Sequence, residues 1–436
     1  MMRKSLVRFA QVIVLFVMVI NAGCSLPVVQ MEQGQEMIGG TGEKDVEQRS
    51  SPIAGDSESV ASTASAASSE WSGATERSEA ARQSAQQQTE PSAGEESHSA
   101  NHATVTTEQT AEPPAVELVP YEGPVEHIFF HPLIAYPELA FDQDAMSKGY
   151  DDWFVTVSEF EKVIASLYEK NYILIDIHSL YERQTVEGKQ VLQAAQLMLP
   201  EGKKPLILSI DDLNYYEYMR QNGNAYKLVL DAQNKIATYS RTPEGHEEIA
   251  YDNEIIPILD RFVEEHPDFS HQGAKGIIAL TGYEGVLGYR TNLIDAPDYQ
   301  QVKQEVMSVI QRLKETGWTF ASHGYGHLDA NKVSYQRLVA DTARWKREVE
   351  PLLGPTSVYI YPYGSRVETG SKKHRYLIDA GFDVLCSVGP APYRKQTPEV
   401  LMMDRRHIDG LAFKTQRDRL LPLFDSEQIL DPIRPE

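Results

Sequence analysis

Cysteine is scarce in this sequence: its 436 residues include only Cys24 and Cys386. Because Cys24 is interpreted below as a processed N-terminus, Cys386 has no partner, which excludes an intramolecular disulfide in the mature chain. Cys386 lies in the apolar run from Asp383 to Val388. This setting predicts a small buried hydrophobic residue and not a nucleophile.

Basic residues are also in short supply, with 41 Lys and Arg against 63 Asp and Glu, for a formal net charge of -22. Nucleic-acid binding needs clusters of Lys and Arg to meet the phosphates, so this composition argues against a nucleic-acid partner. The acidic excess is uneven, because residues 25–118 hold about 16 Asp or Glu and about 4 Lys or Arg. The rest of the chain is only moderately acidic.

The apolar run near the N-terminus, Val12–Ile20, is too short for a comfortable membrane span. Basic residues precede it and Asn21-Ala22-Gly23-Cys24 follows it, an order typical of a secretory signal. The last four residues resemble a bacterial lipobox, in which the cysteine is acylated. We therefore expect residues 1–24 to direct export, and Cys24 to anchor the protein by lipid to the outer face of the bacterial cell membrane. The alternative is an ordinary cleaved signal with a chance cysteine.

Residues 25–118 are nearly devoid of aromatic side chains, Trp71 being the one exception, and they show no helical or strand periodicity. Ser, Ala, Glu, Gln, Thr and Gly dominate, and such a stretch cannot bury enough apolar area to offset its ordering entropy. We predict a disordered linker over 25–118 and one folded domain over 119–436.

The segment from 119 to 436 alternates short apolar strands with helices, which indicates a parallel α/β sheet or barrel. A β-hairpin is expected to interrupt this order at about 214–252, built from Lys235–Tyr239 and Glu248–Tyr251. One helix is expected from Ser158 onward, with a capping box at Ser158 and Glu161. Two more are expected over Tyr299–Thr316 and Tyr335–Leu353. The expected strands cover residues 127–131, 173–175, 205–210, 276–280, 318–321, 357–361, 384–386 and 401–403.

Polar clusters follow three of the expected strands, namely Asp211-Asp212, Ser322–His327 and Tyr361–Gly364. In parallel α/β folds the carboxyl ends of the strands share one rim, so we expect these clusters to meet. Two histidines four residues apart and one carboxylate can form a facial metal site with open positions. A second carboxylate beside it can take a water proton, as metal-assisted hydrolysis requires.

The same clusters resemble three motifs of the polysaccharide deacetylase family (NodB homology, carbohydrate esterase family 4). Ser209–Asp212 is similar to the T-F-D-D motif, Ser322–His327 to H-[ST]-x-x-H, and Tyr361–Gly364 to a Y-P-Y-G form of the third motif. The resemblance spans about residues 125–415 in matching order. It implies a distorted (β/α) barrel and metal-dependent removal of acetyl groups from a cell-wall or extracellular polysaccharide.

Carried over by position, the resemblance implies a site of the following residues. Asp212, His323 and His327 would bind a divalent metal, most simply Zn²⁺ (with Co²⁺, Ni²⁺ or Mn²⁺ as alternatives), and Asp211 would be the general base for water attack on the acetyl carbonyl. Tyr363 would line the acetyl pocket and supply a backbone N–H, and one Arg of Asp404-Arg405-Arg406, for which we choose Arg406, would orient Asp211. Tyr215, Tyr361 and Pro362 would contact the sugar.

The sequence also departs from the family pattern. Gly324 stands where the second motif has Ser or Thr, the third motif lacks its leading Arg, and the late L-x-H motif that supplies a general acid is absent. His407 is the candidate substitute, and among the remaining histidines His131 alone could reach the rim. Three readings stay open: an N-deacetylase, an O-acetyl esterase, and a carbohydrate-binding lipoprotein without turnover. In each, an acetylated polysaccharide is the expected ligand and a monomer the expected state.

Overall fold

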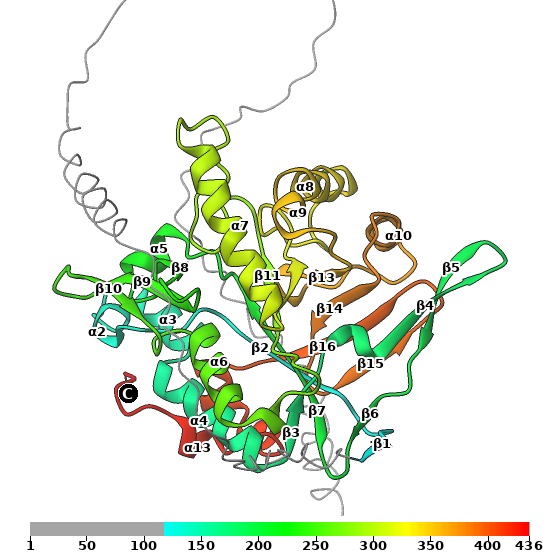
Figure 1. The fold of residues 1–436 in the computed structure, drawn as a ribbon, viewed down its shortest axis with the longest axis horizontal. Helices are drawn as coiled ribbons and strands as arrows, with labels where there is room; N and C mark the ends of the chain where they lie inside the picture. The colour runs from blue at the N-terminus through cyan, green and yellow to red at the C-terminus, as the bar shows by residue number, and fades with distance from the viewer. Residues whose placement is uncertain (1–116, 436) are drawn as a thin grey trace, which may run out of the picture. The chain divides into compact units, whose positions relative to one another are not determined.

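Seven parallel strands close into a barrel in the computed structural model, which describes residues 117–435 (Figure 1). Around the barrel the order is β7, β11, β12, β13, β14, β16 and β2, and β11 pairs with β7 to close the ring. The expected (β/α) barrel is therefore confirmed. The bounds are β2 Glu126–Phe130, β7 Lys204–Asp211, β11 Ile277–Leu280, β12 Thr319–Ser322, β13 Val358–Ile360, β14 Val384–Val388 and β16 Leu401–His407.

The remaining strands extend this barrel or form small sheets beside it. β3 (Tyr172–Leu174) pairs in parallel with the start of β7, and β15 (Tyr393–Gln396) pairs antiparallel with β16. A projecting hairpin, β4 and β5, leaves the barrel between β3 and β7 (Figure 1). The bounds are β1 Leu118–Pro120, β4 Tyr181–Val186, β5 Lys189–Ala194, β6 Met198–Pro200, β8 Lys227–Leu230, β9 Ile236–Arg241 and β10 Glu247–Ala250.

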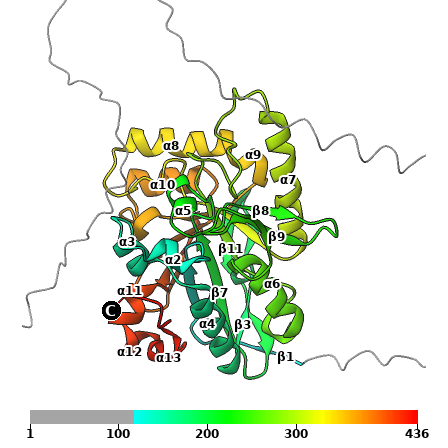
Figure 2. The same cartoon turned by 90° about the vertical axis from the view of Figure 1, so that its left-hand side faces the viewer.

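Helices cover the outside of the barrel, with α4 and α6 on one side and α7 to α10 on the other (Figures 1 and 2). The longer helices are α4 Val157–Glu169, α6 Ile255–Glu265, α7 Tyr299–Glu315, α8 Tyr335–Glu348 and α10 Lys372–Asp379. The shorter ones are α2 Pro137–Ala140, α3 Ser147–Trp153, α5 Glu217–Gln221, α9 Glu350–Leu353, α11 Gly410–Thr415, α12 Arg417–Leu420 and α13 Ser426–Ile429, with 3₁₀ turns η1 Ile177–Leu180, η2 Pro267–Phe269 and η3 Pro362–Gly364.

Side chains alternate between the barrel interior and the helix layer along each strand, as strand geometry requires. In β7, Ile207 belongs to the interior cluster while Leu206, Leu208 and Ile210 pack against helices. Cys386 of β14 lies in the same interior cluster and is fully buried, and burial raises the pKa of its thiol to about 12. The prediction of a buried, unreactive cysteine is confirmed.

Two local predictions needed adjustment. The capping box of α4 is formed by Thr156 and Glu159, two residues before the pair that the sequence suggested, because T-x-x-E and S-x-x-E both occur there. The expected hairpin is present as β9 and β10, and β8 adds a third antiparallel strand to it.

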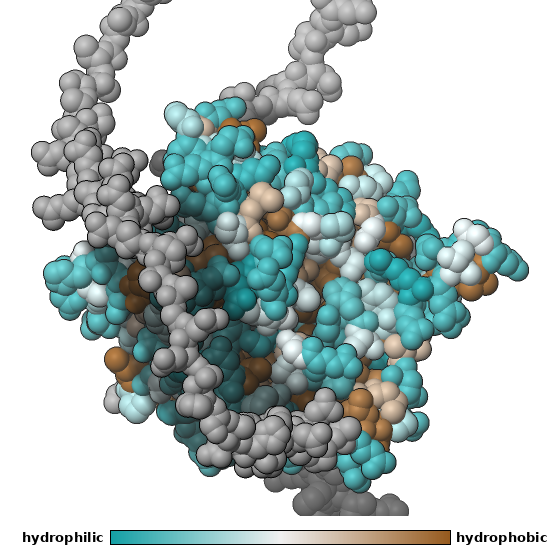
Figure 3. Space-filling view, in the orientation of Figure 1, coloured by the Kyte–Doolittle hydropathy of each residue, from teal (hydrophilic) through white to brown (hydrophobic). Residues whose placement is uncertain are grey.

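The exterior of the domain is largely polar. On the face drawn in Figure 3, hydrophilic side chains predominate and hydrophobic ones form small separate areas. Within residues 117–435, no helix combines the length and apolarity that crossing a bilayer demands. The predicted signal, Cys24 and nearly all of the predicted linker lie outside the described residues.

Candidate metal centre

Asp212, His323 and His327 meet at the carboxyl ends of β7 and β12, where the strand pattern placed them. Each offers one ligand atom, and these three atoms lie within 4.8 Å of one another. Nε2 of His327 is 3.5 Å from Oδ2 of Asp212. Two ligands that each lie about 2.0–2.1 Å from one tetrahedral ion are about 3.4 Å apart, so this pair already has the spacing that Zn²⁺ requires.

Both histidines are prepared for ligation. The backbone carbonyl of Ile360 accepts a hydrogen bond from Nδ1 of His323 at 2.9 Å, which leaves the Nε2 lone pair for a metal. Burial lowers the pKa of His327 to about 4, despite the opposing effect of Asp212. His327 is therefore neutral at ordinary pH, the form in which imidazole binds metals.

Asp212 is held by a second layer of polar side chains. The hydroxyl of Tyr216 donates to Oδ1 of Asp212 at 2.6 Å and lies 2.5 Å from the hydroxyl of Thr281. Burial acts to raise the pKa of Asp212, but His327 and His323 outweigh it, and the pKa lies below its usual value. One oxygen of this carboxylate is thus engaged by the protein, and the other faces His327.

Asp211 points into the barrel interior, where it is bound by Arg405 and not by Arg406. The guanidinium of Arg405 donates to both oxygens of Asp211, at 2.7 and 2.9 Å, and Arg405 is fully buried. Burial acts to raise the pKa of Asp211, but Arg405 and His323 overcome it and bring the pKa to about 2. Asp211 therefore stays ionised.

The choice of Arg406 was wrong. Arg406 has the opposite strand parity, so it points out of the barrel and binds Glu126 at 3.1 Å. Arg405 follows the inward parity of Leu401 and Met403, and it also lies against the ring of Phe129, 4.1 Å from the ring centroid. A guanidinium from β16 thus orients Asp211, although the third motif lacks its leading Arg.

The loop that carries both histidines is fixed by a carboxylate from α8. Asp341 accepts the backbone N–H groups of Tyr325 at 2.7 Å and Gly326 at 2.8 Å. Gly324 adopts φ +67°, and a Cβ there would come within 3.0 Å of the Asp341 carboxylate. This position therefore favours glycine, and the Asp341 carboxylate fixes the loop through the two backbone N–H groups.

Three residues of the site adopt left-handed backbone conformations: Asp212 with φ 59°, His327 with φ 50° and Tyr363 with φ 59°. Non-glycine residues held in this region cost about 1–3 kcal/mol each, and such residues cluster at functional sites. Tyr363 is also 64% exposed, and its ring lies edge-on to His327, 4.5 Å between centroids. The ring thus lies beside a metal ligand, and the roles of Tyr363 in lining the acetyl pocket and supplying a backbone N–H stay predictions.

Two of the expected sugar contacts are wrong. Tyr215 is fully buried and donates to Glu254 at 3.0 Å, because the left-handed turn that follows Asp212 directs it into the core. Tyr361 has outward strand parity and packs in the cluster between the sheet and α10, also fully buried. Pro362 is buried beside Gly324, and its contact with sugar stays a prediction.

His407 does not fit the role of general acid. Nδ1 lies 2.7 Å from the Asp409 carboxylate and Nε2 lies 2.9 Å from the side-chain nitrogen of Gln416, so both ring nitrogens have protein partners. His131 is better placed, because it directly follows β2, which pairs with β7, the strand that carries Asp211. Its Nδ1 lies 3.1 Å from the backbone carbonyl of Trp153, and its Nε2 has no hydrogen-bond partner within residues 117–435. The alternation of His127, Phe129 and His131, along β2 and the residue that follows it, was the available signal.

Comparison with known families agrees with this site. Residues 291–384 match the family model described as Polysaccharide deacetylase. This segment of the chain is therefore similar to polysaccharide deacetylases. The matched segment contains the loop from His323 to His327 and the turn from Tyr361 to Gly364. The structure adds Asp211 and Asp212, which lie outside the match, to the histidines inside it.

Similarity to solved structures is of low identity. The Streptococcus pyogenes deacetylase PplD in complex with acetate is 13% identical, with 72% of this chain and 100% of that chain covered and a TM-score of 0.38. A de-N-acetylase from Aggregatibacter actinomycetemcomitans is 12% identical, covering 68% and 100%, with a TM-score of 0.38. The chitin deacetylase of Colletotrichum lindemuthianum is 12% identical, covering 39% and 75%, with a TM-score of 0.22. A search of curated proteins gives no match.

Proposed function

We propose that this protein removes N-acetyl groups from a polysaccharide by metal-assisted hydrolysis. The observation that carries the proposal is the buried set of Asp212, His323 and His327 beside Asp211, an ionised carboxylate held by Arg405. A protein that only binds sugar has no need of both a metal set and a second, oriented carboxylate. A divalent ion held by the three ligands would polarise the acetyl carbonyl and increase the acidity of water.

The protein side of the mechanism starts with Asp211. Its charge is fixed by Arg405, and each carboxylate oxygen keeps a second lone pair that can accept a proton from the attacking water. Water adds to the acetyl carbon, the C–N bond breaks, and acetate and a free amine leave. Asp211 therefore serves as the base of the reaction.

The departing amine must take a proton, and His131 is the group that can deliver it. The Trp153 carbonyl engages Nδ1, so Nε2 of His131 would carry the proton toward the substrate from the residue that follows β2, the strand next to β7 and Asp211. An amine is a poor leaving group without protonation, whereas an alkoxide leaves more easily. A positioned histidine acid therefore favours the N-deacetylase over the O-acetyl esterase.

Tyr363 and Tyr216 would shape the substrate side of this site. The exposed ring of Tyr363 stands beside His327, where it would flank the acetyl group. Tyr216 stacks on Tyr283, 4.7 Å between ring centroids, and so keeps its hydroxyl on Asp212. The identity of the sugar is open, and we propose a cell-wall or extracellular polysaccharide from the predicted export and lipid anchoring at Cys24.

Acetate release from three substrates tests the proposal: N-acetylglucosamine oligomers, acetylated xylan and an aryl acetate, each with Zn²⁺ or Co²⁺ and with chelator. We expect metal-dependent release from the oligomers and its loss in Asp211→Asn. Release from xylan alone would replace the N-deacetylase with the esterase. Metal binding without release from any of them would favour the binding protein, and activity that survives Asp211→Asn would overturn the mechanism.

A further inference from the structure

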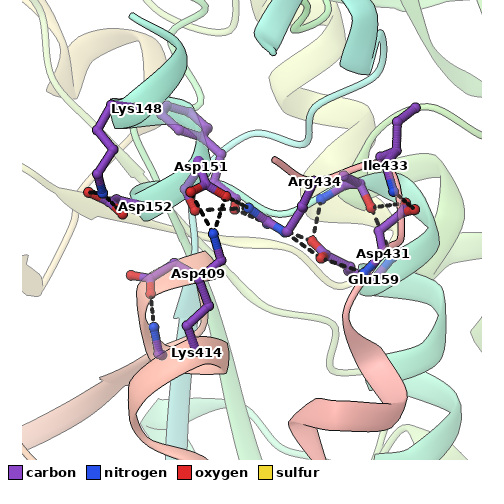
Figure 4. A network of polar contacts seen from close by, with 12 residues as sticks. Lys148, Asp151, Asp152, Glu159, Asp409, Lys414, Asp431, Ile433 and Arg434 are labelled. Atoms are coloured by element: carbon purple, nitrogen blue, oxygen red, sulfur yellow. Dashed lines mark hydrogen bonds and ion pairs between the residues drawn. The ribbon is translucent and has the colours of Figure 1, made fainter. Parts of the chain in front are cut away.

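A buried arginine far along the chain, Arg434, binds the segment that joins α3 to α4. Its side chain is 3% exposed and lies against the Glu159 carboxylate, at 2.5 Å from Nε and 2.7 Å from Nη2. It also reaches the carboxylate of Asp151 at 3.2 Å. Figure 4 shows these contacts, together with the ion pair between Lys414 and Asp151.

The same guanidinium also binds two backbone carbonyls where α3 ends, in the stretch 151–156 that we call the α3–α4 junction. Nη1 donates to the carbonyl of Asp151 at 2.9 Å, and Nη2 donates to the carbonyl of Phe154 at 2.6 Å. Trp153 lies between these residues, and its own carbonyl is the partner of Nδ1 of His131. Arg434 therefore fixes the backbone on both sides of the group that orients His131.

Asp431 binds the other end of the junction, at the start of α4. Its carboxylate accepts the hydroxyl of Thr156 at 2.8 Å, and its N–H donates to Glu159 at 3.0 Å. Val155, in the middle of the junction, accepts the N–H of Ile134, three residues after His131. The loop that carries His131 is thus bonded to the junction. The junction in turn is bound by Asp151, Glu159, Asp431 and Arg434, which we call the Arg434 network.

We infer that Arg434 is a positioning residue for proton delivery: it holds the Trp153 carbonyl where it can orient His131. This inference rests on the proposed function, in which His131 protonates the leaving amine. Arg434 touches neither Asp211 nor the three metal ligands in the structure. Loss of Arg434 should therefore impair the step that uses His131 and spare the steps that use the metal set.

Leaving-group dependence separates this role from general stabilisation of the fold. Hydrolysis of an N-acetyl sugar needs a proton on the amine, whereas a phenolate leaves from an aryl acetate without one. A general acid contributes about 10²- to 10⁴-fold to such a step. A damaged metal site or a partly unfolded domain would slow both substrates by the same factor.

The test compares the full-length His131→Ala, Arg434→Gln and Arg434→Lys variants, loaded with Zn²⁺, on both substrates. Arg417→Gln is the matched control, because Arg417 forms a two-bond ion pair with Asp425 in the same part of the chain but does not contact α3. For Arg434→Gln we expect kcat on N-acetylglucosamine oligomers to fall at least about 10-fold, with aryl acetate turnover within about twofold of wild type. Arg434→Lys should recover little, since an ammonium lacks the planar fork with which the guanidinium reaches both carbonyls and the Glu159 carboxylate together.

The outcomes distinguish a wrong role for His131 from a wrong role for Arg434. If His131→Ala slows both substrates equally, the role of His131 in the proposed function is wrong, and the inference falls with it. If His131→Ala is selective but Arg434→Gln slows both substrates equally, or slows neither, the positioning role of Arg434 is overturned. A selective loss in Arg417→Gln would also contradict it.

Arg434→Gln leaves the buried Glu159 carboxylate without a cation and Asp151 with Lys414 alone, which could prevent folding, so a milder variant is included. Asp431→Asn keeps most of the junction and weakens its contact with Thr156. We expect a selective loss of kcat on N-acetylglucosamine oligomers that is smaller than in Arg434→Gln. The ¹⁵N NMR signal of His131 should also show a weakened Nδ1 hydrogen bond. Unchanged selectivity together with an unchanged His131 signal would count against the inference.

Discussion

At the scale of single residues, the site depends on which way neighbouring side chains point. Arg405 and Arg406 are adjacent and chemically identical, yet one holds Asp211 inside the barrel and the other binds Glu126 outside it. The difference comes from strand parity alone, because successive side chains face opposite sides. The two arginines therefore form a natural pair for testing how Asp211 is oriented.

Replacing Arg405 with Met should raise the pKa of Asp211 from about 2, because burial then acts without the opposing cation. The ionised base would be lost at a higher pH as acidity increases, so the acidic limb of the kcat profile should move upward. We also expect kcat to fall about 10- to 100-fold, the usual cost of losing such a supporting contact. The pH dependence of acetate release measures both effects.

Arg406→Met serves as the control for that measurement. It removes the guanidinium that binds Glu126, so it should lower thermal stability. The acidic limb of the kcat profile should stay where it is in wild type. An acidic limb that moves in Arg406→Met and not in Arg405→Met would reverse the assignment made here.

At the scale of elements, strand ends and loops bring the ligands together, and α8 holds the histidine loop in place through Asp341. Asp341→Asn would keep an oxygen acceptor for one of the two backbone N–H groups but turn its NH2 group toward the other, which loosens the loop between His323 and His327. We expect Zn²⁺ affinity to fall about 10- to 100-fold, as measured by competition with a chromophoric chelator. Gln336→Ala, on the exposed side of the same helix, should bind Zn²⁺ as wild type does. Equal affinity in Asp341→Asn and wild type would show that the loop needs no such support.

Much of this element-level organisation could be predicted from the sequence. The barrel strands carry apolar runs that end in polar clusters, so their type and the meeting of Asp212, His323 and His327 followed from pattern. Parity within a strand was also available, and applying it to Leu401 and Met403 would have selected Arg405. It would also have placed Tyr361 outside the barrel, since Ile360 faces inward.

Other features depend on tertiary structure and have no local signal. The left-handed conformations at Asp212 and His327 are imposed by surrounding contacts, because non-glycine residues avoid that region on their own. The bond between His131 and the Trp153 carbonyl joins two elements that the sequence does not pair. Tyr215 was expected to contact the sugar because it closely follows Asp212, but its hydroxyl donates to Glu254 in the core.

At the scale of the whole molecule, Glu254 couples folding stability to pH. It is fully buried at the start of α6, where it accepts the N–H groups of Leu133 and Ile255 and the hydroxyl of Tyr215. Burial raises its pKa to about 7, from 4.5, despite these three donors. The folded state therefore binds a proton that the unfolded state has already released between these two pH values.

Stability from this group is fully present below about pH 4.5 and is lost as pH rises to about 7, by about 3 kcal/mol in total. Denaturant unfolding at a series of pH values measures the change. Glu254→Gln, which keeps an acceptor for the two N–H groups, should remove this part of the dependence. An identical pH dependence in Glu254→Gln and wild type would show that Glu254 does not titrate in this range.

The central claim is that Asp212, His323 and His327 hold a catalytic metal for N-deacetylation. The most direct measurement is acetate release from N-acetylglucosamine oligomers by metal-stripped protein as Zn²⁺ is added stepwise. We expect no acetate release without metal and full activity at one equivalent of Zn²⁺ per chain. A His327→Ala variant should recover no activity at that Zn²⁺ concentration. Equal release by stripped and loaded protein, or full recovery in His327→Ala, would contradict it.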